Sequence, residues 1–155
     1  MDPLKRFPRP NVAVDVAVLT VIDGPETEPK QLAVLVLERD DDPTGSVLPG
    51  RFLREGESVR DCVTTALAEK AGIRVPPLQP RLLHVFDDPG RDPRGWTISL
   101  AHALALPEDH LLGSTGQLVP VTESGALANN QHLLFDHNEI VNQAVTTLRA
   151  YPAPG

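Results

Sequence analysis

Two long runs of apolar residues near the start of the chain predict β-strands. NVAVDVAVLTVI (residues 11–22) is rich in β-branched residues, and QLAVLVLERD (31–40) follows it after a polar stretch. The nearly continuous apolar middle of the second run indicates a strand that is buried on both faces of a sheet. The polar stretch between them, DGPETEPK (23–30), predicts a hairpin-like loop.

The next segment has the spacing of an amphipathic helix. Ser58 and Asp61 resemble a capping box, with Asp in place of the stronger Glu or Gln. Gly72 is well placed to end the helix in the left-handed conformation. The apolar stripe of this helix consists of Val59, Cys62, Val63, Ala66 and Leu67.

A second amphipathic helix is predicted over FDHNEIVNQAVTTLRAY (135–151), with Asp136 as its N-cap and Glu139 three residues later. Because of its prolines, VPPLQP (75–80) cannot be helical, and ESGALANNQH (123–132) is expected to be a loop. The remaining predicted strands are RLLHVFDD (81–88), WTISLAHALAL (96–106), the weaker GQLVPVT (116–122) and a short one near Val47 and Leu48.

This order of elements, mostly strands with two helices separated by strands, favours an α/β fold. We expect a mixed sheet that is covered by one helix on each face. Residues 1–10 are expected to form an extended N-terminal arm because prolines interrupt them. Residues 11–151 are expected to form a single domain, since 155 residues suffice for one substantial core.

Composition narrows the class of protein. With 41% hydrophobic and 23% charged residues the chain is typical of globular domains. It has no apolar run near the ~18 residues of a membrane span, so we expect no membrane partner. The N-terminus lacks the apolar segment of a secretory signal, and the single cysteine, Cys62, excludes an internal disulfide. These features are compatible with a cytoplasmic protein.

The net charge of −7 argues against direct binding of nucleic acid, because a phosphate backbone requires a basic surface. It does not exclude a small anionic ligand that is held by a local arginine cluster. The candidate ligand-binding residues are Arg39, Arg51, Arg91, Arg94 and Trp96, with Arg54 beside them. The alternative for the arginines is a solvated surface with local Asp–Arg pairs, such as those possible with Asp88 and Asp92, and for Trp96 it is core or interface packing. Phe52 and Phe86 could stack on a base, but a core position is expected for both, as it is for His84.

The segment GRFLREGESVRDCVTTALAEKAGI (50–73) resembles the Nudix box, usually written G-x5-E-x7-R-E-U-x-E-E-x-G-U, where U is aliphatic. The segments FDDPGRDPRGWTISLAHALALP and LLFDHNEIVNQAVTTLR are similar to parts of ADP-ribose-type Nudix proteins, especially the Nudix domains of regulators of NAD metabolism. The resemblance implies a Nudix-type α/β/α sandwich with a mixed β-sheet and a nucleotide-type small-molecule ligand. It also suggests a homodimer, since relatives commonly pair and the arm could reach a partner.

The box is incomplete in its charged positions. Glu57 matches the first glutamate, but the arginine position falls on Thr65 and the next glutamate on Ala66. The final glutamate pair falls on Glu69 and Lys70. The resemblance therefore implies Glu57 and Glu69 as the remaining catalytic and metal-binding candidates, and it implies that the ion pair bracing the loop is lost with Thr65.

Lys70 is the sharpest departure from the box. In working members the helix carboxylates bind Mg²⁺ or another divalent ion, which bridges the diphosphate and activates a water. Two unit charges ~4 Å apart interact by about 4 kcal/mol at an effective dielectric near 20, and the ion is doubly charged. An ammonium group at this position repels the ion, so we expect the standard metal site not to form.

Three functions remain open on the sequence. The loss of carboxylates favours a protein that binds an ADP-ribose-like ligand without efficient hydrolysis. The second is a hydrolase that uses Mg²⁺ or Mn²⁺ in a rearranged site built from Glu55, Glu57, Glu69 and a downstream acid such as Glu123. The third is a Nudix fold retained for protein–protein interaction, with no small-molecule ligand.

Overall fold

The computed structural model describes residues 2–23, 30–74 and 79–150. Most of the predicted loop 23–30, most of the segment 75–80 and the predicted helix end at Tyr151 lie outside the described residues. None of the described helices is both long and apolar enough to cross a membrane.

The described elements follow the predicted order. The strands are β1 (Asn11–Ile22), β2 (Gln31–Arg39), β3 (Gly45–Val47), β4 (Gly50–Phe52), β5 (Arg81–Phe86), β6 (Thr97–Ala105) and β7 (Gln117–Pro120). The α-helices are α1 (Val59–Ala71) and α2 (His137–Ala150). Three short 3₁₀ helices cover Pro3–Arg6, Glu108–Leu111 and Ala128–Asn130.

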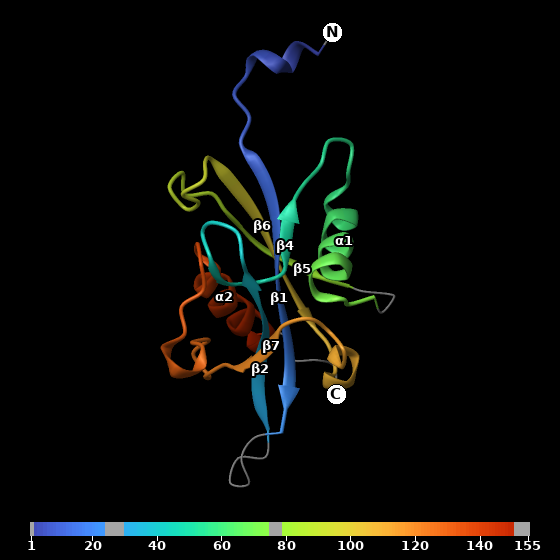
Figure 1. Ribbon diagram of the computed structural model, residues 1–155, viewed down its shortest axis with the longest axis vertical. Helices are drawn as coiled ribbons and strands as arrows, with labels where there is room; N and C mark the ends of the chain where they lie inside the picture. Colours follow the sequence, from blue (N-terminus) through green and yellow to red (C-terminus); the bar gives the residue numbers. More distant parts are fainter. Residues whose placement is uncertain (1, 24–29, 75–78, 151–155) are drawn as a thin grey trace.

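The sheet is mixed, as predicted. β1 runs parallel to β6 and antiparallel to β2 and β4, and the order along the sheet is β3-β2-β1-β6-β5. Helices α1 and α2 lie on opposite sides of this sheet (Figure 1). The predicted α/β/α sandwich with a mixed β-sheet is therefore confirmed.

The period of two along β1 divides the core between the two helices. Val14, Val16 and Val18 pack into the cluster under α1, together with the apolar stripe of that helix. Ala17 and Leu19 belong to the cluster under α2. Asp15 has the same parity as Ala17 and Leu19, so it lies on the α2 side of the sheet, at the edge of that core.

The sheet forks at β1. β6 occupies one edge of β1. Along the other edge, β1 pairs with β4 over Ala13–Asp15 and with β2 over Leu19–Ile22. Between these stretches the N–H of Val16 donates to the carbonyl oxygen of Pro49 at 2.8 Å. The strands β2 and β4 diverge at this point. Side chains from both helical layers, α1 and α2, reach the space between the two strands.

The ends of α1 follow the sequence. The Ser58 hydroxyl accepts a hydrogen bond from the N–H of Asp61 at 3.1 Å. Gly72 has φ 71° and ψ 22°, the left-handed conformation that favours glycine, and its N–H bonds back to the last turn. Both predicted caps are confirmed.

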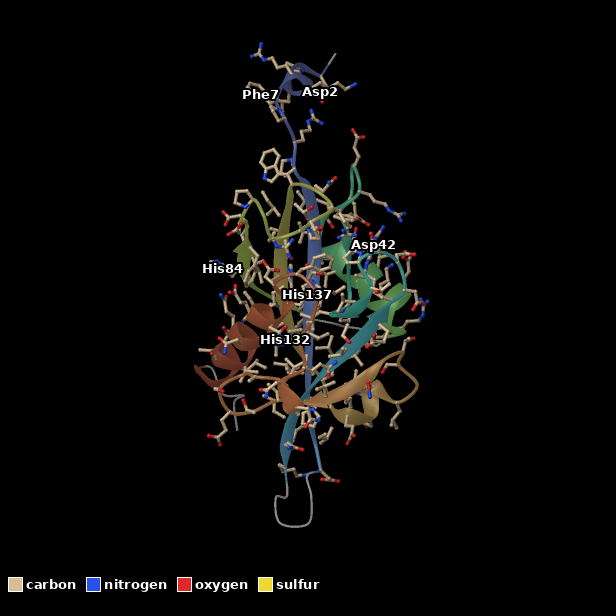
Figure 2. The ribbon with its side chains drawn as sticks, turned by 60° about the vertical axis from the view of Figure 1, so that its left-hand side comes forward. Asp2, Phe7, Asp42, His84, His132 and His137 are labelled. Atoms are coloured by element: carbon tan, nitrogen blue, oxygen red, sulfur yellow. The ribbon has the colours of Figure 1, made fainter. Side chains whose placement is uncertain are left out.

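Several expectations were wrong. The predicted extended arm contains the short helix Pro3–Arg6, β4 was not predicted, and the helix Ala128–Asn130 lies where a loop was expected. His84 is exposed, not in the core, because it lies on β5 at the end of the sheet, where it packs edge-on against Phe86 with ring centroids 5.3 Å apart. Figure 2 shows His84 at the outside of the molecule and His137 within it.

Candidate functional site

A cavity of about 430 Å³ opens at the fork of β1. Such a volume is typical of small-molecule sites, which range from about 300 to 1,000 Å³. Glu69 and Lys70 reach it from the last turn of α1, and His137 reaches it from the start of α2. The strands and loops contribute Ala13, Asp15, Arg39, Val47, Leu48, Gly50, Arg51, Phe52, Arg54, Arg91, Asp92, Arg94, Thr97 and Phe135.

A buried carboxylate, that of Asp15, lines the cavity. Ser99 Oγ donates to its Oδ2 at 2.6 Å, and His137 Nε2 lies 3.3 Å from its Oδ1. Arg91 Nη2 lies 3.9 Å from Oδ2. Burial alone would raise the pKa of Asp15, but His137, Ser99 and Arg91 together lower it below its ordinary value. Asp15 is therefore a fixed anion inside the fold.

His137 joins two distant segments. The backbone N–H of Leu48 donates to its Nδ1 at 3.0 Å, so that nitrogen acts as the acceptor. The hydrogen-bond network thereby assigns the proton to Nε2, which faces Asp15. The ring ties the start of α2 both to β1 and to the turn between β3 and β4.

Arg91 is buried and paired with Asp136. Its Nε and Nη2 donate to the two carboxylate oxygens of Asp136 at 2.8 and 2.6 Å, and its side chain is 3% exposed. Burial disfavours the charged guanidinium, but Asp136 and Asp15 outweigh burial and raise the pKa of Arg91. Asp136 stands at the predicted N-cap position of α2, where its backbone carbonyl accepts from Ile140, but its carboxylate binds Arg91 and makes no capping bond in the described part of the chain.

Position 50 requires glycine because the backbone of β4 passes very close to Asp15 and Val14 of β1. A β-carbon on Gly50 would collide with Oδ1 of Asp15 and with the carbonyl oxygen of Val14. Glycine thus allows β4 to pass directly beside the buried carboxylate.

Arg51 supplies an ion pair that the sequence did not predict. Its Nη1 donates to Oε2 of Glu57 at 2.8 Å, and the N–H of Arg54 donates to Oε1 at 3.1 Å. The bond from Arg54 and the pair with Arg51 outweigh desolvation and hold the pKa of Glu57 below its ordinary value. The pair that the Nudix box places between Glu57 and position 65 is absent, as expected with Thr65, but Arg51 of β4 forms a different pair with the same carboxylate. Beneath this pair, burial and the neighbouring Glu57 raise the pKa of the Cys62 thiol to about 11.

Two phenylalanine rings flank the guanidinium of Arg94. Its central carbon lies 5.2 Å from the ring centroid of Phe52 and 5.1 Å from that of Phe135. The same guanidinium donates to both oxygens of Asp92, at 3.0 and 2.8 Å. The expected core position of Phe52 was wrong, since its ring is 41% exposed at the cavity, whereas Phe86 is buried as predicted. The φ of Phe135 is 58°, an uncommon value for a non-glycine residue.

Three cationic side chains at the cavity have no carboxylate partner in the described part of the chain. Arg39 donates to the carbonyl oxygens of Pro43 and Asp42, at 3.0 and 3.4 Å, which leaves its charge uncompensated. Arg54 and Lys70 are exposed, and neither takes part in an ion pair among the described residues.

The side chains at the cavity do not fit a divalent metal ion. Mg²⁺ and Mn²⁺ require several hard oxygen ligands, in near-octahedral array for Mg²⁺. Asp15 and Asp92 are held by their hydrogen-bond partners, Ala66 is buried in the core, and Glu69 offers a single carboxylate beside Lys70. Within the described residues, no group of three or more His, Cys, Asp or Glu side chains could hold a metal ion.

The structure brings most of the predicted ligand-binding residues together. Arg39, Arg51, Arg91 and Arg94 all line the cavity, as does Glu69. Glu57 is not among the lining residues because Arg51 and the loop engage it. Trp96 is also outside the lining, with 47% of its surface exposed.

Sequence reasoning missed Asp15, His137 and Phe135. A signal for Asp15 was present, because a carboxylate inside an apolar strand requires a partner in the fold. No comparable signal identified Phe135, which precedes α2, or His137, which opens it. Aromatic and polar residues are ordinary at these positions.

Known proteins resemble this chain in sequence and in fold. No family model matches the chain. It is 32% identical over 114 residues to an ADP-ribose pyrophosphatase of Methanocaldococcus jannaschii, a match that covers 72% of this chain and 65% of that protein, just under two thirds of its length.

Two solved structures share the fold over nearly the whole chain. The Nudix domain of Shewanella oneidensis NrtR, crystallised with ADP-ribose, has a TM-score of 0.74 and 26% identity, covering 96% of this chain and 94% of that one. A MutT/Nudix family protein of Listeria innocua has a TM-score of 0.73 and 25% identity, covering 90% of this chain and 94% of that one.

Proposed function

We propose that this chain, which belongs to the Nudix superfamily, binds an ADP-ribose-like nucleoside diphosphate derivative at the fork of β1, with little or no standard metal-dependent hydrolysis. The observation that carries the proposal is the concentration of positive charge. Six cationic side chains line the cavity of a protein whose net charge is −7. Arginine and lysine at such density match the oxygen atoms of a diphosphate.

The cavity offers side chains that suit two parts of such a ligand, the diphosphate and the base. Arg39, Arg54 and Lys70 present uncompensated charge to the diphosphate. The rings of Phe52 and Phe135 offer apolar faces on which a base can stack, a contact worth about 1–3 kcal/mol per base in nucleic-acid complexes. The NrtR domain crystallised with ADP-ribose supports the choice of ligand.

Calorimetric titration of the protein with ADP-ribose tests the proposal. We expect binding, and we expect the Arg54→Gln variant to bind about tenfold more weakly, the loss of one charge-assisted contact. Arg60→Gln is the matched control, because Arg60 is exposed on α1 and does not line the cavity. Equal weakening by both variants would contradict binding at this cavity.

A hydrolase is the second candidate, favoured by Glu69 at the cavity and by the 32% identity to an ADP-ribose pyrophosphatase. Hydrolysis of ADP-ribose breaks one P–O bond of the diphosphate and yields AMP and ribose 5-phosphate. Mg²⁺ or Mn²⁺ would be the cofactor of that activity. Incubation of the protein and of its Glu69→Gln variant with ADP-ribose and each ion separates the candidates. AMP that the wild type forms and the variant does not would replace the binding proposal by this one.

The N-terminal arm supports a homodimer. Leu4 and Phe7 are 61% and 52% exposed on a segment that leads away from the sheet (Figure 2). Packing against a second copy of the chain would remove this apolar surface from water. Light scattering after size exclusion tests the pairing, with Phe7→Ser expected to shift the mass toward the monomer. A monomeric wild type at all accessible concentrations would contradict it.

A further inference from the structure

The cavity contains more positive charge than its own carboxylates neutralise. We propose that Lys70, together with Arg54 and Arg39, supplies the charge that holds the diphosphate, so that the ligand binds without a divalent metal ion. This inference rests on the proposed function and adds to it the identity of the counter-charge.

The first observation is that half of the cationic groups at the cavity are already neutralised. The pairs are Arg51–Glu57 at 2.8 Å, Arg91–Asp136 at 2.6 Å and Arg94–Asp92 at 2.8 Å. In each pair at least one side chain is less than a tenth exposed. Breaking these pairs would leave a charge without its partner, so they shape the cavity and are poorly suited to neutralise a ligand.

The second observation is the charge that remains. Arg39 donates to neutral carbonyl oxygens, and no ion pair in the described part of the chain involves Arg54 or Lys70. Glu69 and Asp15 are the carboxylates at the cavity that have no arginine of their own, since Arg91, 3.9 Å from Asp15, is already paired with Asp136. Three cations against these two carboxylates leave one net positive charge at the cavity, which attracts the negative charge of a diphosphate diester.

The third observation is the position of Lys70. Positions 66, 69 and 70 are three and four apart, so they share one face of α1. Ala66 is buried against the sheet, whereas Glu69 and Lys70 extend to the cavity. An ammonium group on a flexible stem can approach phosphate oxygens from several directions, and it repels a divalent cation from the same space.

Lys70 also has a simpler structural role to be weighed. A lysine in the last turn of a helix interacts favourably with the helix dipole, and Lys70 lies in that turn. That role affects the stability of α1 and is indifferent to ligands. Measurements of stability and of binding on the same variants therefore distinguish the two roles.

Calorimetric titrations in chelator and in Mg²⁺, with ADP-ribose and with inorganic pyrophosphate as probes, test the inference. We expect the wild type to bind both probes in chelator. Lys70→Gln should weaken both by about tenfold while its thermal unfolding stays that of the wild type. Lys5→Gln, which removes the same charge from the arm, should change nothing. Lys70→Glu should bind more weakly than Lys70→Gln in chelator.

The outcomes separate this inference from the proposed function. If the wild type binds ADP-ribose in Mg²⁺ but not in chelator, the inference is overturned and the proposed function stands. So would binding in chelator that neither Lys70 variant weakens. Lys70-dependent binding of pyrophosphate in chelator, without binding of ADP-ribose, would support the anion site and contradict the nucleotide ligand. Failure of both probes under both conditions would overturn both.

Discussion

The cavity has an inner wall, whose charged side chains are buried and hydrogen-bonded, and an outer wall, whose charged side chains face solvent or the cavity. The inner wall is formed by Asp15, Arg91 and His137, which are buried and hydrogen-bonded to one another or to adjacent residues. The outer wall is formed by Arg39, Arg54, Glu69 and Lys70 and faces solvent or the cavity. Within the described part of the chain, its residues form none of the carboxylate–cation pairs that hold the inner wall.

Burial explains the difference. A charge inside the fold is stable only with a partner, so every inner-wall group fixes the position of another segment. An exposed charge is hydrated and needs no partner. The inner wall therefore joins β1, the loop after β5 and the start of α2 into one frame, while the outer wall remains available to a ligand. The same residue type, arginine, serves both purposes at Arg91 and Arg54.

The largest effect is expected at the centre of the inner wall. Asp15→Ala removes the acceptor of Ser99 and His137 and leaves Arg91 with one carboxylate fewer. Loss of one member of a buried charged network costs about 3–5 kcal/mol of the free energy of unfolding. Urea unfolding followed by circular dichroism measures it. A loss below about 1 kcal/mol, the cost of one ordinary hydrogen bond, would show that the network does not stabilise the fold.

A matched pair of arginine variants compares the walls directly. Arg91→Met leaves the carboxylate of Asp136 without its bidentate partner and should lower the free energy of unfolding by about 2 kcal/mol. Arg54→Met makes the same change on the exposed outer wall and should stay within about 0.5 kcal/mol of the wild type. Both are measured by urea unfolding, and equal effects would refute the distinction between the walls.

Local sequence patterns predicted the long strands and the helices well. β1 has the bounds that its apolar run indicated, and Ser58 and Gly72 cap α1 as expected. These features depend on neighbours within a few residues, which a single sequence contains. β4 was missed because a strand of three residues has too short a pattern to detect, yet it forms one side of the fork.

The pairings of the inner wall could not be predicted because the partners are far apart along the chain. Ser99 and Asp15 are 84 positions apart, and Leu48 and His137 are 89 apart. The ion pair of Glu57 was missed for a different reason. The Nudix box places the partner of Glu57 at position 65, where Thr65 carries no charge, whereas in the fold Arg51 of β4 approaches the same carboxylate.

The dependence of stability on pH provides a smaller and graded test of the inner wall. The pKa of Asp15 is lower in the folded than in the unfolded chain, so its contribution is present above the ordinary carboxyl pKa of 3.8 and is lost as pH falls through the lower folded value. Below about pH 4 the wild type should lose stability more steeply than Asp15→Asn, by at most about 1.4 kcal/mol per pH unit. Urea unfolding at a series of pH values measures both slopes. Parallel slopes would contradict a lowered pKa.

The smallest effect on stability is expected at Phe52, which lines the cavity beside the guanidinium of Arg94. Phe52→Leu removes one partly exposed cation–π contact and should cost about 0.5–1 kcal/mol in urea unfolding. Its effect on binding is more informative, because a ring that stacks on the base should matter for ADP-ribose and be irrelevant to pyrophosphate. Phe7→Leu is the matched control, since Phe7 also lies under an arginine, Arg6, but on the arm. Weaker binding of pyrophosphate by Phe52→Leu would show that the ring shapes the anion site instead of holding a base.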